Sequence, residues 1–84
     1  MQDLDLSKEI LLYPNPSDGD VFVELLNGDR IDQIVIYGVD GKVLAKQRGT
    51  SNELKLDTNK LDAGLYFVMV QSADGVGVGR FLKI

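Results

Sequence analysis

Short apolar runs separated by turn residues recur along almost the whole chain. In Glu53–Asp57 apolar and polar residues alternate strictly, which places Leu54 and Leu56 on one face of an extended strand. In Leu65–Val70 the run is continuously apolar, as expected of a central, buried strand. No window has the helical period. The pattern therefore predicts strands and no helix.

The apolar runs predict about seven short strands at the spacing of a β-sandwich. In the third of them, Ile34 and Ile36 are expected on the buried face and Asp32 and Gln33 at the rim. The predicted strands are Ile10–Tyr13, Val21–Leu26, Ile31–Tyr37, Lys42–Lys46, Glu53–Asp57, Leu65–Val70 and Val76–Ile84.

The segment Leu61–Tyr66 supports a sandwich of the immunoglobulin type. It places Tyr66 just inside a strand after a corner, as in the tyrosine corner of Ig-like domains. We expect the Tyr66 ring to be buried, its hydroxyl to bond to the preceding loop, and Leu61 to reach the core. The cysteine pair and core tryptophan of antibody domains are absent. The predicted fold is all-β, an Ig-like antiparallel β-sandwich in architecture only.

Three turn signals organise the chain. Pro14 and Pro16 fix φ and favour an extended Asn15, and Gly19 is expected at a turn position with positive φ. Asp40-Gly41 predicts a type I′ hairpin turn. Asp74-Gly75 predicts a second hairpin turn that leads into the last strand. The glycines and terminal charges of that strand are typical of a sheet edge.

The length of 84 residues suits one domain. Residues 1–9, with mixed charge and no firm period, are predicted to be a linker or a remnant of expression. Residues 10–84 are predicted to form the domain. Neither a secretory leader nor an apolar run long enough to span a bilayer is present, so we expect any signal peptide to lie upstream.

Composition excludes several function classes. Without cysteine or histidine the chain has no disulfide, no thiolate metal site and no usual general base. The net charge of −4 argues against a nucleic-acid partner. The serines lack a catalytic partner, and Val76–Gly79 opens no helix that could bind phosphate. We therefore predict neither enzymatic activity nor a cofactor.

The aspartates at turns have two interpretations. Clustered carboxylates could bind calcium, but Asp at a turn also bonds its own backbone. The spacing lacks the pattern of a calcium loop, so turn chemistry is favoured and no metal is predicted. The aspartates concerned are Asp18, Asp20, Asp40, Asp62 and Asp74.

Four motifs in order resemble the C-terminal sorting domain of the type IX (Por) secretion system, type A. The resemblance runs from about Ile10 to the last residue. The motifs are Tyr13-Pro14-Asn15-Pro16 with Gly19, Ile34–Tyr37 with Gly41-Lys42-Val43, Leu61–Val68, and Arg80-Phe81-Leu82-Lys83-Ile84. The chain departs from the family at Gly38, where members commonly carry Asp or Asn. Asp40 is expected to cap the turn in its place.

The resemblance implies an export signal at the end of a larger, N-terminal cargo protein. Secretion-system components would recognise it in the periplasm and direct the cargo through the outer-membrane translocon to the cell surface, where a sortase typically removes it. The implied recognition residues are Pro14, Asn15, Pro16, Gly19, Asp40, Gly41, Lys42, Gly64, Tyr66, Arg80, Phe81, Leu82, Lys83 and Ile84.

Two hypotheses concern exposed strand edges. The last strand, as an unpaired edge, could accept a strand from the secretion machinery, and the domain could form a homodimer through its exposed edge strands. The rival functions are an Ig-like adhesion or spacer module and a carbohydrate-binding module of a bacterial surface protein. The latter needs an exposed aromatic platform, for which Tyr13, Phe22 and Tyr37 are candidates.

Overall fold

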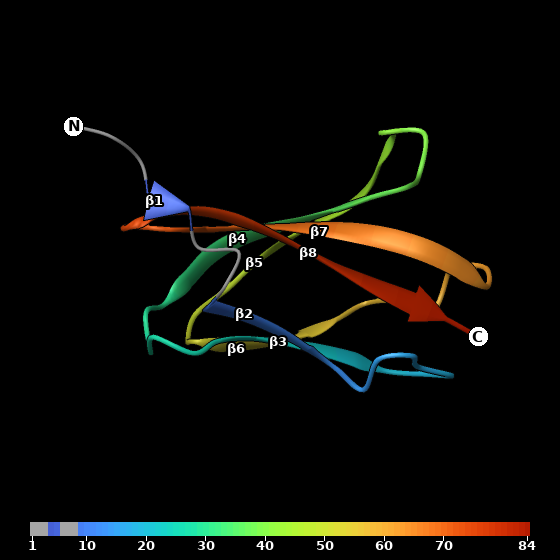
Figure 1. Ribbon diagram of the computed structural model, residues 1–84, viewed down its shortest axis with the longest axis horizontal. Helices are drawn as coiled ribbons and strands as arrows, with labels where there is room; N and C mark the ends of the chain where they lie inside the picture. Colours follow the sequence, from blue (N-terminus) through green and yellow to red (C-terminus); the bar gives the residue numbers. More distant parts are fainter. Residues whose placement is uncertain (1–3, 6–8) are drawn as a thin grey trace.

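Two packed β-sheets make up the domain (Figure 1). The computed structural model describes residues 4–5 and 9–84 and shows no α-helix within them. The strands are β1 (Leu4–Asp5), β2 (Ile10–Tyr13), β3 (Val21–Leu25), β4 (Ile31–Tyr37), β5 (Val43–Arg48), β6 (Glu53–Leu56), β7 (Gly64–Ser72) and β8 (Gly75–Lys83). The predicted strands from Ile10 onward are all present, and the predicted all-β sandwich is confirmed.

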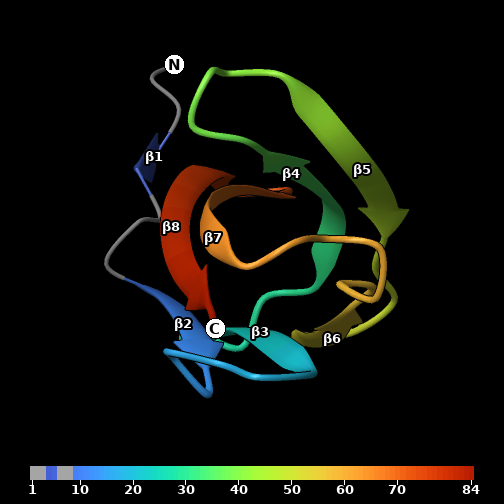
Figure 2. The ribbon, with the colours of Figure 1, turned by 90° about the vertical axis from the view of Figure 1, so that its right-hand side faces the viewer.

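The larger sheet has the order β1-β8-β7-β4-β5 and the smaller has the order β2-β3-β6. All pairs are antiparallel except β1 with β8, which is parallel. The two sheets face each other around the core when the sandwich is viewed from its end (Figure 2). The central strand of the larger sheet is β7, as its continuous apolar run predicts.

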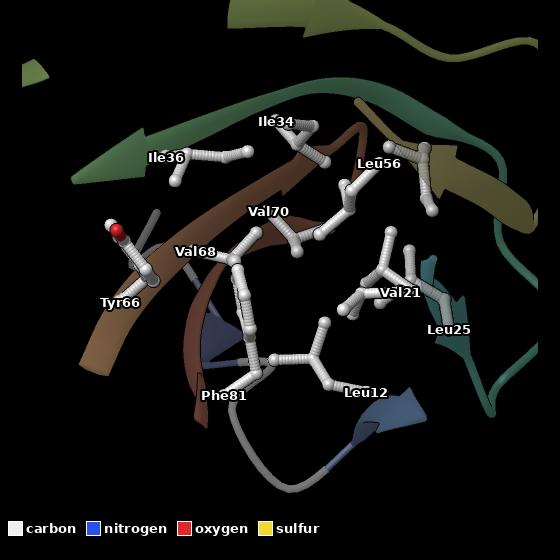
Figure 3. Close-up of a cluster of buried hydrophobic side chains, with 12 residues drawn as sticks. Leu12, Val21, Leu25, Ile34, Ile36, Leu56, Tyr66, Val68, Val70 and Phe81 are labelled. Atoms are coloured by element: carbon white, nitrogen blue, oxygen red, sulfur yellow. The ribbon is translucent and has the colours of Figure 1, made fainter. Parts of the chain in front are cut away.

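The core follows from the alternation of side chains along the strands (Figure 3). Every second residue of β3 is fully buried, and Ile34 and Ile36 of β4 face it from the larger sheet. The rings of Tyr66 and Phe81 stack with centroids 5.4 Å apart. The buried cluster consists of Leu12, Val21, Val23, Leu25, Ile31, Ile34, Ile36, Leu56, Tyr66, Val68, Val70 and Phe81. Leu61 packs against it from the β6–β7 loop, as predicted.

A glycine lets the smaller sheet approach β8. A Cβ atom at Gly79 would lie 2.8 Å from the Leu12 Cδ1 atom and 3.1 Å from the Ile10 Cγ2 atom. The leucine and isoleucine of β2 therefore occupy the space that a side chain on β8 would need. Gly79, one of the β8 glycines that suggested an edge strand, is therefore explained by close packing inside the sandwich.

Three expectations about local structure are wrong. First, β8 lies between β7 and β1 and is not the edge of its sheet. Second, all described residues with positive φ are glycines, so Asp40 does not adopt a type I′ conformation. The turn is instead closed by a bond from Gly41 N–H to the Gly38 carbonyl, with positive φ at Gly41 alone. Third, φ at Gly19 is not positive.

The segment 1–9, predicted as a linker, contains one strand that the apolar pattern did not reveal. Leu4 pairs with Gly75 and Asp5 with Val76, both in parallel. Two residues carry too little pattern to predict a strand. The rest of the prediction for residues 1–3 and 6–8 lies outside the described residues.

Candidate recognition site

The four sequence motifs lie at one end of the sandwich. We call residues 13–19, which contain both prolines, the proline corner. Gly64, which begins β7, pairs with Lys83 at the end of β8, and Ser17 of the proline corner forms a bridge to the same lysine. Tyr37, which ends β4, pairs with Phe67 near the start of β7. Figure 2 looks onto this end: the β2–β3 loop lies beside the C-terminus, and the β4–β5 hairpin stands apart from both. We call it the motif end.

Asn15 binds the outer edge of β8 in the way a neighbouring strand would. Its side-chain carbonyl accepts a hydrogen bond from Leu82 N–H at 3.0 Å, and its amide group donates to the Arg80 carbonyl at 3.1 Å. Ser17 continues the pairing through its own backbone, donating to the Leu82 carbonyl at 2.9 Å and accepting from Ile84 N–H at 2.8 Å. A side-chain amide carries one donor and one acceptor like a peptide group, so the proline corner covers this edge.

The hypothesis that the last strand presents an unpaired edge is therefore wrong. β1 pairs with the start of β8, and Asn15 and Ser17 occupy its end. Covering an exposed edge prevents the addition of a foreign strand. Gln47 of β5 makes an equivalent contact on the opposite side of the sandwich: it donates to the Lys55 carbonyl at 3.1 Å and accepts from Asp57 N–H at 2.8 Å.

Lys83 joins β8 to the loop before β7. Its ammonium group donates to the Thr58 carbonyl at 2.6 Å and to the Leu61 carbonyl at 2.7 Å. The buried Thr58 in turn donates through its hydroxyl to the Gly19 carbonyl at 3.1 Å. The proline corner, the β6–β7 loop and β8 thus form one hydrogen-bonded unit. Sequence reasoning named Lys83 only as an implied recognition residue and did not find its structural role, because a terminal lysine is most often a solvated charge. It did not single out Thr58.

Tyr66 completes this unit as a tyrosine corner. Its hydroxyl donates to the Asp62 carbonyl in the preceding loop, and its ring is buried, as predicted. At the hairpin, Asp40 Oδ1 accepts from Lys42 N–H at 3.0 Å, so Asp40 does cap the turn that follows Gly38. The hydrogen bonds given for the turn residues 38–42 stay within the turn, and the hairpin is joined to the third motif through the pairing of β4 with β7.

We expect Asn15→Leu to lower the free energy of unfolding by about 1–2 kcal/mol, because two solvent-accessible hydrogen bonds are lost at nearly constant side-chain volume. Urea denaturation measures the loss. Amide exchange at Leu82 should also accelerate. The matched control is Asn59→Leu, an exposed asparagine whose side chain makes no such contact, for which we expect a change within about 0.5 kcal/mol. Equal losses in both variants would contradict the role of Asn15.

Among the turn aspartates, Asp40 makes the expected bond to its own turn. Asp57, which the prediction did not name, accepts from Asn59 N–H in the same way, whereas Asp20 pairs with the distant Lys55 at 3.3 Å. No group of three potential metal ligands occurs among the described residues.

Asp29 and Asp74 form a carboxyl pair between the β3–β4 loop and the β7–β8 turn. A hydrogen bond with Asp74, together with partial burial and charge repulsion, raises the pKa of Asp29. The folded state therefore holds a proton that the unfolded state releases, so stability falls as pH rises through the window just above the usual Asp pKa. We expect Asp74→Asn to lower the Asp29 pKa and to remove this decline, as measured by NMR titration and by urea denaturation between pH 4 and pH 7. An unchanged profile would contradict the pairing.

The candidate aromatic platform does not form a flat surface. Tyr13 and Phe22, both half-buried, stack against each other across β2 and β3 with centroids 5.7 Å apart. The Tyr13 hydroxyl donates to the Glu53 carboxylate, which raises the pKa of Tyr13 to about 12. Tyr37 lies on the larger sheet instead. Rings that stack on each other across a sheet do not offer a shared open face to a sugar.

Comparison with known proteins shows the family of this chain. The model of the "Secretion system C-terminal sorting domain" family matches residues 11–83, which include the four motifs except for Ile84. The chain belongs to this family. It is a C-terminal sorting signal of type IX secretion. The proline corner and the end of β8, which bind each other, lie within the matched range except for Ile84.

Two similar proteins are consistent with this membership. Beta-agarase A of Zobellia galactanivorans is 35% identical over 57 residues, which cover 68% of this chain and 11% of that protein. A solved chain from a study of PorZ, an essential bacterial surface component of the type-IX secretion system of Porphyromonas gingivalis, has a TM-score of 0.72 and 22% identity. The match covers 92% of this chain and 12% of that chain, and it supports the fold. The sorting domain thus spans about a tenth of each similar protein.

The described part of the sorting domain contains no helix long and apolar enough to cross a membrane.

Proposed function

We propose that this domain directs an N-terminally attached cargo protein from the periplasm through the type IX outer-membrane translocon to the cell surface. The family match supports the role, and one structural observation carries the proposal: the proline corner, the β6–β7 loop and β8 bind one another at a single end of the sandwich. Motifs far apart in sequence thereby become neighbours on one folded surface that secretion-system components can recognise.

The proposed recognition residues divide into two groups. Phe81, Tyr66 and Lys83 hold the motif end together, since their side chains are buried or bound to backbone carbonyls. The residues available for contact are exposed at the same end: Pro14, Pro16, Asp40, Gly41, Lys42, Arg80, Leu82 and Ile84. Asn15, Gly19 and Gly64 shape the backbone between them. The domain acts as an address and has no catalytic role of its own in this proposal.

The proposed partners are the translocon components, a surface sortase that removes the domain after export, and the cargo. An edge-strand homodimer also stays a prediction. Because β1, Asn15 and Ser17 cover β8, such a dimer would use another sheet edge, such as that of β5, where Val43 and Leu44 are exposed. Sedimentation of the purified domain checks it.

A reporter fusion tests the proposed function. The domain is fused behind a reporter that carries a periplasmic signal peptide, in a host with type IX machinery. We expect the reporter outside the cell or at its surface, and retention in the periplasm when the machinery is deleted or the domain is omitted. Periplasmic retention of the intact fusion would contradict the proposal.

A further inference from the structure

The larger sheet has a second face, directed away from β2, β3 and β6, against which no further sheet or helix of the described chain packs; we call it the outer face. Its side chains follow from the strand register, because paired residues point to the same side. Three rows run across the sheet: Leu82 and Leu65; Arg80, Phe67 and Tyr37; Val78, Met69, Val35 and Lys46. The next row, Val76, Gln71, Gln33 and Arg48, is more polar.

This outer face is apolar at its centre and exposed toward the motif end. Leu65 and Leu82 retain 38% and 42% of their accessible surface. Phe67 and Met69 are half-buried, and Val35 is covered although it points away from the core. A sandwich that faced only water on this side would carry alternating polar residues there. Aromatic residues, methionine and arginine are those enriched where proteins bind one another.

Three cations border the apolar centre of the outer face. Arg80 lies on one side of it, and Lys46 and Arg48 lie on the other. The carboxylate residues nearest to these rows are at the polar end of the face, where Asp5 of β1 pairs with Val76 and Asp32 precedes Gln33. The smaller sheet shows the contrast, since Glu24 and Glu53 are paired directly opposite each other there.

We propose that the outer face is the docking surface for a protein of the export machinery that presents an apolar surface bordered by carboxylates. This inference rests on the proposed function and adds the surface and the chemistry of the partner. The edge of β8 is closed, so docking uses side chains of β8, β7, β4 and β5.

The size of the outer face suits a transient contact. Four strands about 4.8 Å apart and about six residues long span roughly 15–20 Å in each direction. A face of these dimensions has a smaller area than the roughly 800 Å² per partner of a standard stable interface. An export signal has to be released after each passage, for which a small, charge-steered interface is appropriate.

The test compares charged substitutions on and off the outer face in the reporter fusion. Leu82→Glu has a matched control in Leu11→Glu, because both leucines lie in strands and are 42% exposed, one on each sheet. Arg80→Glu has a control in Lys60→Glu, an exposed cation on the β6–β7 loop. Urea denaturation of each purified variant checks that it is folded at the assay temperature. If Leu82→Glu is unfolded, the comparison of Arg80→Glu with Lys60→Glu alone tests the inference.

We expect Leu82→Glu and Arg80→Glu to reduce export at least about tenfold, and both controls to stay within about twofold of the unsubstituted fusion, since a carboxylate would face carboxylates and apolar surface. Export of all four variants at the unsubstituted level would overturn the inference and leave the proposed function intact. Failure of the unsubstituted fusion itself would overturn the proposed function. Binding of the isolated domain to phosphatidylglycerol vesicles that is lost in Arg80→Glu would instead assign the face to an anionic membrane and overturn the protein partner.

Discussion

Phe81→Ala is expected to lower the free energy of unfolding by about 3–5 kcal/mol, the usual cost of removing a fully buried phenylalanine. Phe81 is fully buried and stacks on Tyr66, and it lies between the two sheets at the motif end (Figure 3). Because small domains are stable by only about 5–15 kcal/mol, such a loss unfolds a large share of the molecules. Urea denaturation monitored by circular dichroism measures it.

The matched control is Phe67→Ala. Phe67 occupies the neighbouring strand but is half-buried on the outer face. We expect it to lose less than half as much stability as Phe81→Ala, because less apolar surface is returned to water. Equal losses in the two variants would show that the core does not extend to β8 in the way described.

Lys83→Met is expected to lower the free energy of unfolding by about 3 kcal/mol. The ammonium group satisfies the carbonyls of Thr58 and Leu61, and bonds that involve a charged group contribute about 1.5–3 kcal/mol each. Methionine keeps the length of the side chain and supplies no donor. We also expect faster amide exchange in the β6–β7 loop, which the lysine holds against β8.

Lys60→Met is the control for Lys83→Met, because Lys60 is an exposed lysine of the β6–β7 loop, the loop that Lys83 binds. Its substitution should change stability by no more than about 0.5 kcal/mol. A loss for Lys83→Met as small as that of the control would mean that the two carbonyl contacts do not contribute to stability.

These two residues also change how the last strand can be tested. Deleting residues 81–84 would remove the buried Phe81 and the Lys83 contacts together, so a loss of export would follow from unfolding alone. Single substitutions at exposed positions such as Leu82 separate recognition from stability, because the backbone bonds to Asn15 and Ser17 stay in place.

The fold was predictable from the sequence because its main determinant is local. Alternation in Glu53–Leu56 and the apolar run of β7 are properties of a few consecutive residues, and they fix which side chains face the core. The tyrosine corner was predictable for the same reason: Tyr66 and its acceptor Asp62 are four residues apart. The hairpin after Tyr37 was located correctly, although its turn type was wrong.

Whether β8 is an edge strand could not be predicted from consecutive residues. Whether a strand is an edge depends on what lies beside it, and the residues that cover β8 are 67 positions away in the case of Asn15 and Leu82. An exposed asparagine between two prolines has the same sequence signal whether it caps its own turn or binds a distant strand. The outer face was equally hidden, because its rows exist only once four strands are in register.

The central claim is that the export machinery recognises a folded surface and not a linear sequence. The most direct measurement is surface delivery of a reporter fused to the Phe81→Ala domain, at a temperature at which the isolated variant is unfolded and the unsubstituted domain is folded. Every exposed residue of the motif end is unchanged in this variant. The account predicts that the reporter stays in the periplasm. Delivery of the variant at the level of the unsubstituted fusion would contradict it.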